Sequence, residues 1–312
     1  MSVSVIHGDC REELYSLPKR SVQCCVTSPP YYGLRDYGVA GQLGLEPSPD
    51  AYISEIVEMF RGVRRVLRDD GTLWLNLGDS YAAGGNGGGA KDSKQQTNVG
   101  SLLPPKRAPL GFKPKDLLMI PARVALTLQA DGWYLRSEII WHKPNPMPES
   151  CKDRPTSAHE KVYLFAKSPM YFYNADAIAE SGTGRASGKH TPDKTGAGKG
   201  FEVRGGFHKV GDVQWHTRNA RNVWTISPTP YDGAHFATMP VELAEKCILA
   251  GSRVGDTVLD PFGGVGTTGL VARNHARKAI LIELNHEYVQ MALDRIHGPL
   301  FAPTASQAAA TA

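Results

Sequence analysis

Apolar residues along the chain follow two alternating patterns. Residues 21–28, 72–80 and 278–285 contain near-continuous apolar runs that predict buried strands, whereas 50–67 carries apolar residues three and four positions apart and predicts an amphipathic helix. The stretch 68–71 (RDDG) is expected to form the turn that ends this helix. Further strands are expected over 2–9, 133–143, 161–168 and 257–262, and further helices over 10–17, 121–132, 241–251, 269–276 and 287–296. This alternation favours an α/β fold with a mostly parallel sheet covered by helices.

Two long stretches interrupt the pattern. Residues 82–115 begin with a glycine-rich run and carry six Lys or Arg against the single acid Asp92. Residues 176–222 carry eight basic residues against five acids, with glycines throughout. Loops this long are usually functional or disordered. They are either solvated linkers or arms that follow a nucleic-acid backbone.

The bulk composition limits the class of protein. The 312 residues are 41% hydrophobic and 21% charged, which is typical of a soluble globular chain. The sequence contains no run of about 18 apolar residues and no signal-peptide pattern at its start. The five cysteines form no CxxC pair, and no cluster has metal-ligand spacing, so we expect a reducing cytoplasm and no metal. A net charge of +4 permits a polyanionic partner without requiring one.

A glycine-rich turn near the end of the chain has the context of a nucleotide-binding site. A predicted strand enters Gly264-x-Gly266-x-x-Gly269, and a predicted helix follows. Glu283 ends the next strand, where an acid can bind ribose hydroxyls. Tight packing of the turn is one alternative, and an NAD-dependent oxidoreductase is another. Asp260 and Pro261 oppose NAD, because an acid beside the turn would repel a pyrophosphate but would tolerate a positively charged cofactor. The late position of the turn in the sequence indicates a permuted nucleotide-binding fold.

A second motif identifies a family. TSPPY at 27–31 together with DPFGGVGTT at 260–268 resembles the S-adenosylmethionine-dependent DNA amino-methyltransferases, with the catalytic motif first, as in the β-class order. The resemblance continues through 67–79, 137–150, 159–168 and 222–226. It implies a Rossmann-like, doubly wound, mostly parallel sheet of the permuted methyltransferase type, with long inserted loops. The cofactor it implies is S-adenosylmethionine, and the implied substrate is double-stranded DNA.

The same resemblance assigns roles in catalysis. The Ser28 hydroxyl and the Pro29 carbonyl would accept hydrogen bonds from the target amino group, which localises its lone pair for attack on the sulfonium methyl. Pro30 would stiffen the turn, and Tyr31 would stack on a base flipped out of the duplex, which recovers about 1–3 kcal/mol. The competing interpretation is a strand that ends at proline, with both tyrosines in the core.

Further residues are implied for the cofactor. The methionine side would lie against Asp260, Phe262, Gly264 and Gly266. Thr267 and Thr268 would bind the carboxylate, and Glu283 the ribose. Asp9 would lie near the adenine, although it equally suits a helix cap. His235 and Thr238 match the segment before the cofactor half, but Phe236 stands where the family more often has proline.

For DNA contacts, the resemblance divides the chain into a catalytic domain, an insert and loops. Residues 1–175 and 223–297 would form the methyltransferase domain, 82–115 a basic loop, 176–222 a target-recognition insert and 298–312 a flexible tail. Trp141, His142 and Lys143 either end a strand structurally or line the base pocket. The candidate DNA-binding residues are Lys143, Arg204, Gln214, Arg218, Asn219 and Arg221.

Several alternatives stay open at this point. Serine at the first motif position is associated with cytosine N4 and aspartate with adenine N6, which favours cytosine without excluding adenine. The lack of a Pro-Cys dipeptide argues against a C5-cytosine enzyme. The rival classes are the NAD-dependent oxidoreductase and a catalytically silent nucleic-acid-binding module; RNA is the alternative substrate. We expect a cytoplasmic protein of prokaryotic or phage type acting on nucleoid DNA. The partners to test are a second copy in a homodimer and a cognate restriction endonuclease, the alternative being an orphan enzyme without an endonuclease.

Overall fold

The computed structural model describes residues 2–82, 111–149, 151–182, 217–228 and 238–298. Most of the basic loop 82–115, the predicted contacts Arg204 and Gln214, His235, and the tail from residue 299 lie outside the described residues.

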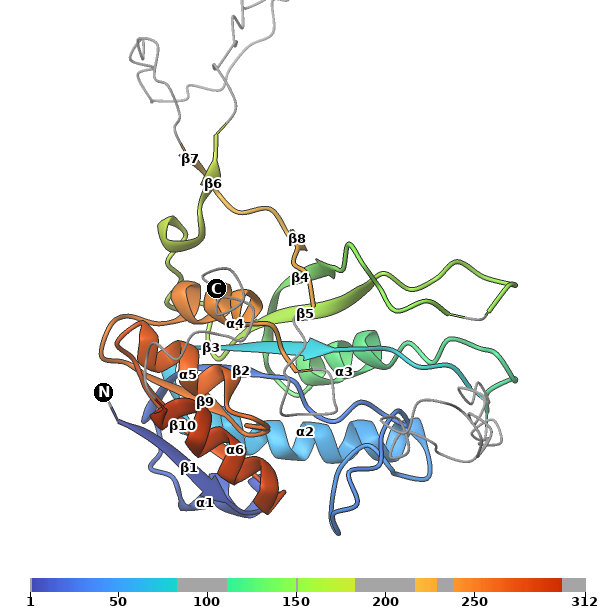
Figure 1. Cartoon of the computed structure of the whole chain (residues 1–312), viewed down its shortest axis with the longest axis horizontal. Coiled ribbons are helices and arrows are strands. Elements are labelled where there is room, and N and C mark those ends of the chain that lie inside the picture. Colours follow the sequence, from blue (N-terminus) through green and yellow to red (C-terminus); the bar gives the residue numbers. More distant parts are fainter. Residues whose placement is uncertain (1, 83–110, 150, 183–216, 229–237, 299–312) are drawn as a thin grey trace, which may run out of the picture.

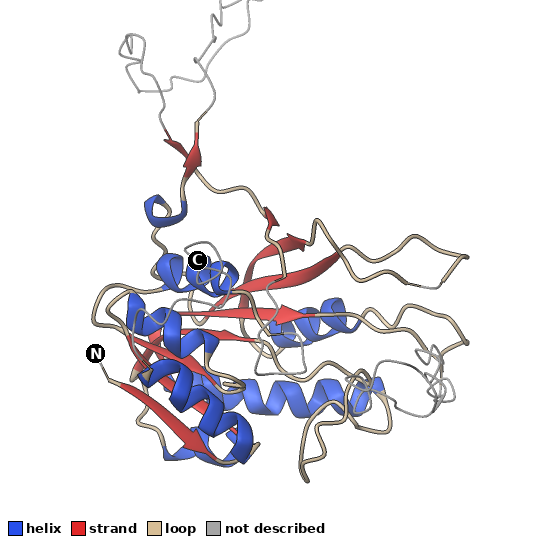
Figure 2. Cartoon of the chain, viewed as in Figure 1, coloured by secondary structure: helices blue, strands red, loops and turns tan. Residues whose placement is uncertain are grey.

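One large sheet forms the centre of the molecule (Figures 1 and 2). Its strands, in spatial order, are β1 (Val3–His7), β10 (Lys278–Glu283), β9 (Thr257–Asp260), β2 (Val22–Thr27), β3 (Leu67–Leu77), β5 (His159–Ala166), β4 (Tyr134–His142) and β8 (Val223–Thr225). All neighbouring strands are parallel except that β5 runs antiparallel to both β3 and β4. The predicted α/β fold with a mostly parallel sheet is confirmed.

Helices cover both faces of this sheet. Alternate residues of β2 show the division, because Cys25 packs with α1 (Cys10–Ser16), α2 (Pro49–Val66) and α3 (Ile120–Ala130), whereas Cys24 and Val26 pack with α4 (Val241–Gly251) and α5 (Thr267–Asn274). Helix α6 (His286–His297) packs on the outer strands beside α5. Burial on both faces explains why the central strands are apolar without interruption.

The chain reverses its direction across the sheet between β2 and β9. From β2 it proceeds through α2 to β3 on one side, and from β9 it proceeds through α5 to β10 on the other. Such a switch point is where open α/β sheets bind ligands, at the carboxyl ends of the strands. The loops that follow β2, β3 and β4 leave from this edge (right in Figure 1).

The stretch 68–71 differs from its prediction. Instead of a free turn, it lies within β3, which begins at Leu67 directly after α2. Leu67 pairs with Val22, and the register then shifts so that Thr72 pairs with Cys24. The extra residues bulge outward and their acids find basic partners, so a composition typical of a turn forms an irregular strand. The elements η2 (Asp176–Ile178), β6 (Glu180–Ser181), β7 (Thr217–Arg218) and β8, of two or three residues each, were not predicted from the pattern.

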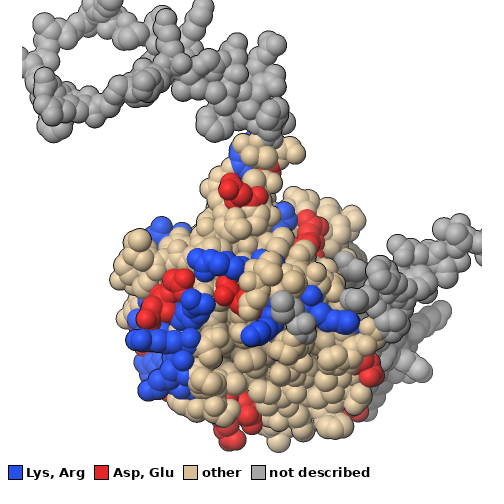
Figure 3. Space-filling model, turned by 90° about the vertical axis from the view of Figure 1, so that its left-hand side faces the viewer, with Lys and Arg blue, Asp and Glu red and all other residues tan. Residues whose placement is uncertain are grey.

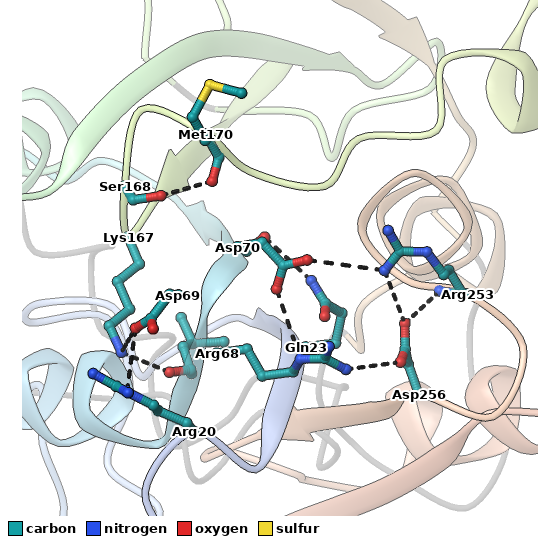
Figure 4. Close-up of polar contacts among 11 residues, drawn as sticks. Arg20, Gln23, Arg68, Asp69, Asp70, Lys167, Ser168, Met170, Arg253 and Asp256 are labelled. Carbon is teal, nitrogen blue, oxygen red and sulfur yellow. Dashed lines mark hydrogen bonds and ion pairs between the residues drawn. The ribbon is translucent and has the colours of Figure 1, made fainter.

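That bulge builds a network of ion pairs at the amino end of the sheet (Figures 3 and 4). Asp69 contacts Arg20 and Lys167, both at 3.3 Å, and Arg68 reaches Asp256 at 3.4 Å. Arg253 lies between Asp70 and Asp256, at 3.9 and 4.0 Å. These basic side chains (Arg20, Arg68, Lys167 and Arg253) each have an acidic partner, and the edge on which they lie is opposite the carboxyl ends of the parallel strands.

Gly251, at the end of α4, lies where that helix packs closely on the sheet, and its substitution tests this packing. A Cβ atom there would lie 2.6 Å from Cys24 Sγ and 2.7 Å from Trp74 Nε1. We therefore expect Gly251→Ala to lower the free energy of unfolding by about 1–3 kcal/mol in urea titrations. Val254→Ala is the control, because Val254 is 68% exposed. Equal stability of both variants and the wild type would contradict this packing.

Candidate active site at the carboxyl edge of the sheet

The two sequence motifs meet through one buried side-chain contact. Thr27, the last residue of β2, donates a hydrogen bond to Asp260 Oδ1 at the end of β9, at 2.7 Å. The Asp260 carboxyl also accepts from the Phe262 amide (3.1 Å) and from the Thr268 hydroxyl (2.7 Å). Asp260 therefore fixes the start of the catalytic motif, the glycine turn and the start of α5 relative to one another.

The Asp260 carboxyl is buried and has lost its contact with water. Burial raises the pKa of its carboxyl from 3.8 to about 7, against the opposing effect of the hydrogen bonds from Thr27, Thr268 and the Phe262 amide. The side chain is therefore partly protonated near neutral pH. Asp260 is only 5% exposed, so it lies behind the ligand-facing surface and supports it.

Glycine is required at two positions of the turn for different structural reasons. Gly264 has φ +49° and lies half-buried, and a Cβ there would have no heavy atom closer than 4.0 Å. Gly266 has φ +82°, and a Cβ there would approach Ala292 of α6 to 3.0 Å. Gly264 thus leaves room for a ligand beside the backbone, whereas Gly266 allows α6 to pack closely on the turn.

Glu283 holds the turn from β10. Its Oε2 accepts the Gly264 amide at 2.7 Å and its Oε1 accepts the Asn285 amide at 2.8 Å. Burial raises the pKa of this carboxyl, although the amide hydrogen bonds oppose the shift. A carboxylate oxygen can accept two hydrogen bonds, so each of these oxygens, which accepts one amide, retains a lone pair that suits ribose hydroxyls.

The remaining candidate residues for cofactor binding are Phe262, Thr267 and Thr268, and they differ in burial and in their hydrogen bonds. Phe262 is half-buried and packs against the core that contains Leu259 and Ile282. Thr268 donates its hydroxyl proton to Asp260, whereas Thr267 Oγ1 accepts from Arg295 at 2.8 Å and so retains a proton to donate. The contacts of these two hydroxyls with a carboxylate stay a prediction. Further donors here are the amide groups of the first turn of α5, which the helix leaves without carbonyl partners.

Asp9 has the helix-capping role that the sequence left open. Its Oδ1 accepts the Arg11 amide at 2.8 Å as the N-cap of α1. The Arg11 guanidinium also contacts both carboxylate oxygens. A role near the adenine stays a prediction.

The catalytic motif leaves β2 as a rigid corner. The Pro30 carbonyl accepts the Tyr52 hydroxyl at 2.9 Å, which fixes the turn. The Pro29 carbonyl accepts no hydrogen bond within the described residues. Ser28, half-buried, lies 3.2 Å from the Tyr31 hydroxyl. Both predicted acceptors therefore lie beside the switch point.

Tyr31 and Lys143 converge on an acid that the sequence analysis did not select. The Tyr31 hydroxyl lies 2.6 Å from Glu160 Oε2, and its ring packs directly against Gly78. Lys143 Nζ binds Glu160 Oε1 and lies 4.5 Å from the centroid of the Trp141 ring. The only sequence signal for Glu160 was its position within 159–168, as a charged residue opening an apolar strand.

Trp141 and His142 make structural contacts. Trp141 Nε1 donates to the Ile226 carbonyl at 2.9 Å, and His142 Nδ1 lies 3.2 Å from Thr225 Oγ1. Both contacts attach β8 to β4, which agrees with the structural alternative for these two residues.

The described ends of the 176–222 insert form a narrow stem. Strands β6 and β7 pair as an antiparallel ribbon that stands away from the sheet (top of Figure 1). Glu180 binds Arg218 at 3.1 Å and Arg221 at 2.9 Å, and Asn219 is exposed beside them. Two of the predicted DNA-binding residues are therefore ion-paired at the base of the insert.

Two further observations concern the described parts of the chain only. No group of three or more His, Cys, Asp or Glu side chains is arranged there to hold a metal. No described helix is long and apolar enough to cross a membrane.

The raised pKa of Asp260 predicts a pH dependence of stability. Between its ordinary value of 3.8 and about 7, the unfolded chain releases this proton while the folded protein retains it. The contribution of Asp260 to stability therefore falls as pH rises through this window and is constant above it. In urea titrations, Asp260→Asn should lose less free energy of unfolding than wild type between about pH 4 and about pH 7. The exposed Asp50→Asn should follow wild type; identical pH profiles for all three would refute the shift.

Comparisons with known proteins agree with this geometry. The model of the N6/N4 methyltransferase family, described as DNA methylase, matches residues 22–294. The chain is 45% identical over 295 residues to the type II methyltransferase M.SmaI of Serratia marcescens, covering 95% of this chain and 91% of that protein. It is 31% identical to M.SfiI of Streptomyces fimbriatus, with 90% and 88% covered.

Solved structures show the same fold. The cytosine-N4-specific PvuII DNA methyltransferase aligns with a TM-score of 0.66 at 22% identity, covering 97% of this chain and 89% of that one. M1.HpyAVI, solved as a complex with S-adenosylmethionine, aligns with a TM-score of 0.55 at 18% identity, covering 95% and 99%. The sequence match extends over both motifs and the strands that carry them, and this chain therefore belongs to the N6/N4 family of DNA methylases.

Proposed function

We propose that this DNA methylase transfers the methyl group of S-adenosylmethionine to the exocyclic amino nitrogen of a base flipped out of double-stranded DNA. The observation that supports this proposal is the Thr27–Asp260 hydrogen bond, at 2.7 Å, because it joins the residue before Ser28 to the strand that enters the glycine turn. The family match disfavours both the NAD-dependent oxidoreductase and the silent binding module.

The residues of the turn suit this cofactor. Glu283 offers lone pairs to ribose hydroxyls, Gly264 leaves room beside the backbone, and the first-turn amides of α5 suit a carboxylate. When bound, S-adenosylmethionine supplies an electrophilic methyl on a positively charged sulfur. The carboxyls of Asp260 and Glu283 tolerate that charge, whereas they would oppose a pyrophosphate.

The catalytic corner suits the amino group of a base. Ser28 Oγ and the Pro29 carbonyl would accept its two hydrogens, which draws the nitrogen lone pair out of the aromatic ring. The Pro30 carbonyl is anchored by Tyr52, so the acceptors are held in place before the base arrives. The Tyr31 ring would stack on the base and offset part of the cost of flipping.

Within this activity, Ser28 favours cytosine N4 over adenine N6. Both bases offer the same two N–H hydrogens, and a neutral hydroxyl is a weaker acceptor than a carboxylate. The family association of serine with cytosine N4 is what supports the choice.

The insert 176–222 is proposed to read the target sequence, with Lys143 and the exposed Asn219 as further contacts. Arg218 and Arg221 would exchange Glu180 for DNA phosphates, because their guanidinium groups bind either partner. The type II name of the relatives supports a cognate restriction endonuclease and cytoplasmic action on the bacterial chromosome. A homodimer is the remaining prediction, and the mass of the protein in solution tests it.

Mass spectrometry of nucleosides tests the proposed function directly. DNA is incubated with the protein and S-adenosylmethionine carrying an isotopically labelled methyl group, and is then digested. Labelled N4-methylcytosine is expected. Labelled N6-methyladenine would refute the choice of base alone, and label in RNA but not in varied DNA sequences would refute the substrate.

Two variants separate catalysis from cofactor binding. Ser28→Ala should lower kcat by about 100-fold while the Kd for S-adenosylmethionine stays unchanged, because the lost acceptor acts on the base. Glu283→Ala should raise that Kd by about 10- to 100-fold, since it removes charged hydrogen-bond acceptors. Calorimetry and single-turnover kinetics measure both, with the exposed Ser54→Ala and Glu287→Ala as controls. A Ser28→Ala variant that loses cofactor affinity as much as turnover would contradict the assigned role.

A further inference from the structure

Ser28 begins a chain of hydrogen bonds that ends on Glu160. The Ser28 hydroxyl lies 3.2 Å from the Tyr31 oxygen, and the Tyr31 hydroxyl lies 2.6 Å from Glu160 Oε2. Ser28 and Tyr31 belong to the corner after β2, whereas Glu160 lies near the start of β5, beyond β3 in the sheet. The acid thus reaches the catalytic serine only through the tyrosine.

Glu160 is held firmly in this position. Its side chain is 15% exposed, and its Oε1 binds Lys143 Nζ. Its Oε2 also accepts Asn76 Nδ2 at 3.1 Å, and the same amide group donates to the Lys161 carbonyl at 3.2 Å. Because every contact of Glu160 is with a donor, the carboxylate acts as an acceptor throughout.

The Tyr31 hydroxyl has a single proton and three oxygens within hydrogen-bond reach, one of which is Ser28 Oγ at 3.2 Å. Glu160 Oε2 lies at 2.6 Å and Asn76 Oδ1 at 3.1 Å. The shorter bond to a charged acceptor is the stronger one, so the proton is donated to Glu160. Burial, together with the charge of Glu160 and the hydrogen bond to it, raises the pKa of Tyr31 well above 10. The phenol therefore keeps its proton at ordinary pH and remains a donor to Glu160.

The direction of this bond fixes the direction of the next one. A tyrosine oxygen that donates to Glu160 presents its lone pairs to Ser28, so the Ser28 proton is directed at Tyr31. The outward side of Ser28 Oγ then carries lone pairs only. We propose that Glu160 is a positioning residue that acts through Tyr31 to keep Ser28 an acceptor toward the target amino group, an inference that rests on the proposed function.

This arrangement also bears on which bases are accepted. An acceptor-only Ser28 attracts an amino group, as on cytosine or adenine, and repels a carbonyl oxygen at the same place, as on thymine or uracil. The hydrogen-bond chain would thus reject deaminated bases without any contact between Glu160 and DNA.

The same sheet contains a matched set of residues that lacks the serine. Tyr163 donates to Glu138 Oε2 at 3.2 Å, and Lys161 Nζ lies 3.0 Å from Glu138 Oε1. Glu138 lies on β4, and within the described residues the side-chain hydrogen bonds of this trio reach no residue of the catalytic corner. Glu138→Gln is therefore a control for loss of a Tyr–Glu–Lys contact as such.

The test compares Glu160→Gln, Tyr31→Phe, the double variant and Glu138→Gln. Glutamine offers one acceptor and one donor where Glu160 accepts three hydrogen bonds, so the amide would turn a donor toward Tyr31 or Lys143. Methyl transfer to cognate DNA gives kcat and KM, and calorimetry gives the Kd for S-adenosylmethionine. We expect kcat of Glu160→Gln to fall by about 10- to 100-fold, while KM for DNA and the cofactor Kd change by less than about threefold.

Coupling between the two sites gives the decisive readout. Tyr31→Phe keeps the ring but breaks the chain, so adding Glu160→Gln should lower kcat by less than about threefold further. Glu138→Gln should retain wild-type kcat. Wild-type kcat for Glu160→Gln, or effects of the two substitutions that multiply in the double variant, would overturn the inference.

Failure of the proposed function and failure of this inference alone give different results. A wild-type protein that methylates no DNA overturns the proposed function and this inference together, whereas active wild type with unaffected Glu160→Gln overturns the inference alone. Thermal unfolding checks each variant. If Glu160→Gln does not fold, Glu160→Asp replaces it, because the shorter acid keeps the charge but withdraws from Tyr31. The same loss of kcat is then expected, and an unchanged kcat overturns the inference.

Discussion

A buried hydrogen bond from Thr27 to Asp260 joins two segments that lie 233 residues apart in the sequence. The two residues end adjacent parallel strands at the point where the chain reverses its direction across the sheet. An unpaired carboxyl at this depth would be costly, so Asp260 requires Thr27, Thr268 and the Phe262 amide together. The geometry of the corner that carries Ser28 and that of the glycine turn therefore depend on one another.

Many residues around the site fix the position of the strands, helices and turns that carry the candidate residues. Asp260 positions α5 and β2, Tyr52 anchors the Pro30 carbonyl, and Gly266 lets α6 approach the turn. A few half-buried residues remain as candidates for contact with ligands, among them Ser28, Phe262 and Glu283. Transfer reactions of this kind need acceptors fixed before the substrate arrives, and rigid support supplies that fixation.

The sequence predicted the long elements because each satisfies a strong period over many residues. It also predicted the two motifs, since proline and glycine mark backbone geometry directly. It did not predict β6, β7 and β8, which are too short to show a period. Nor did it predict that 68–71 would join β3, because the acids there are explained by partners such as Lys167 and Arg253 that only the fold brings near. Glu160 was not predicted as a site residue for the same reason, because its hydrogen bond with Tyr31 depends on the register between β3 and β5.

The antiparallel direction of β5 has a consequence for how the molecule tolerates change. A parallel strand in this place would begin at the far edge, and eight residues of strand span about 26 Å. Because β5 is reversed, its second residue, Glu160, lies beside the catalytic corner, and the strand is followed by Lys167, which contacts Asp69 at the opposite edge. Side-chain contacts therefore fix both ends of β5. Insertion or deletion of one residue within the strand would displace either Glu160 or Lys167 from its partner, so we expect the length of β5 to be constrained as strongly as the identity of these two residues.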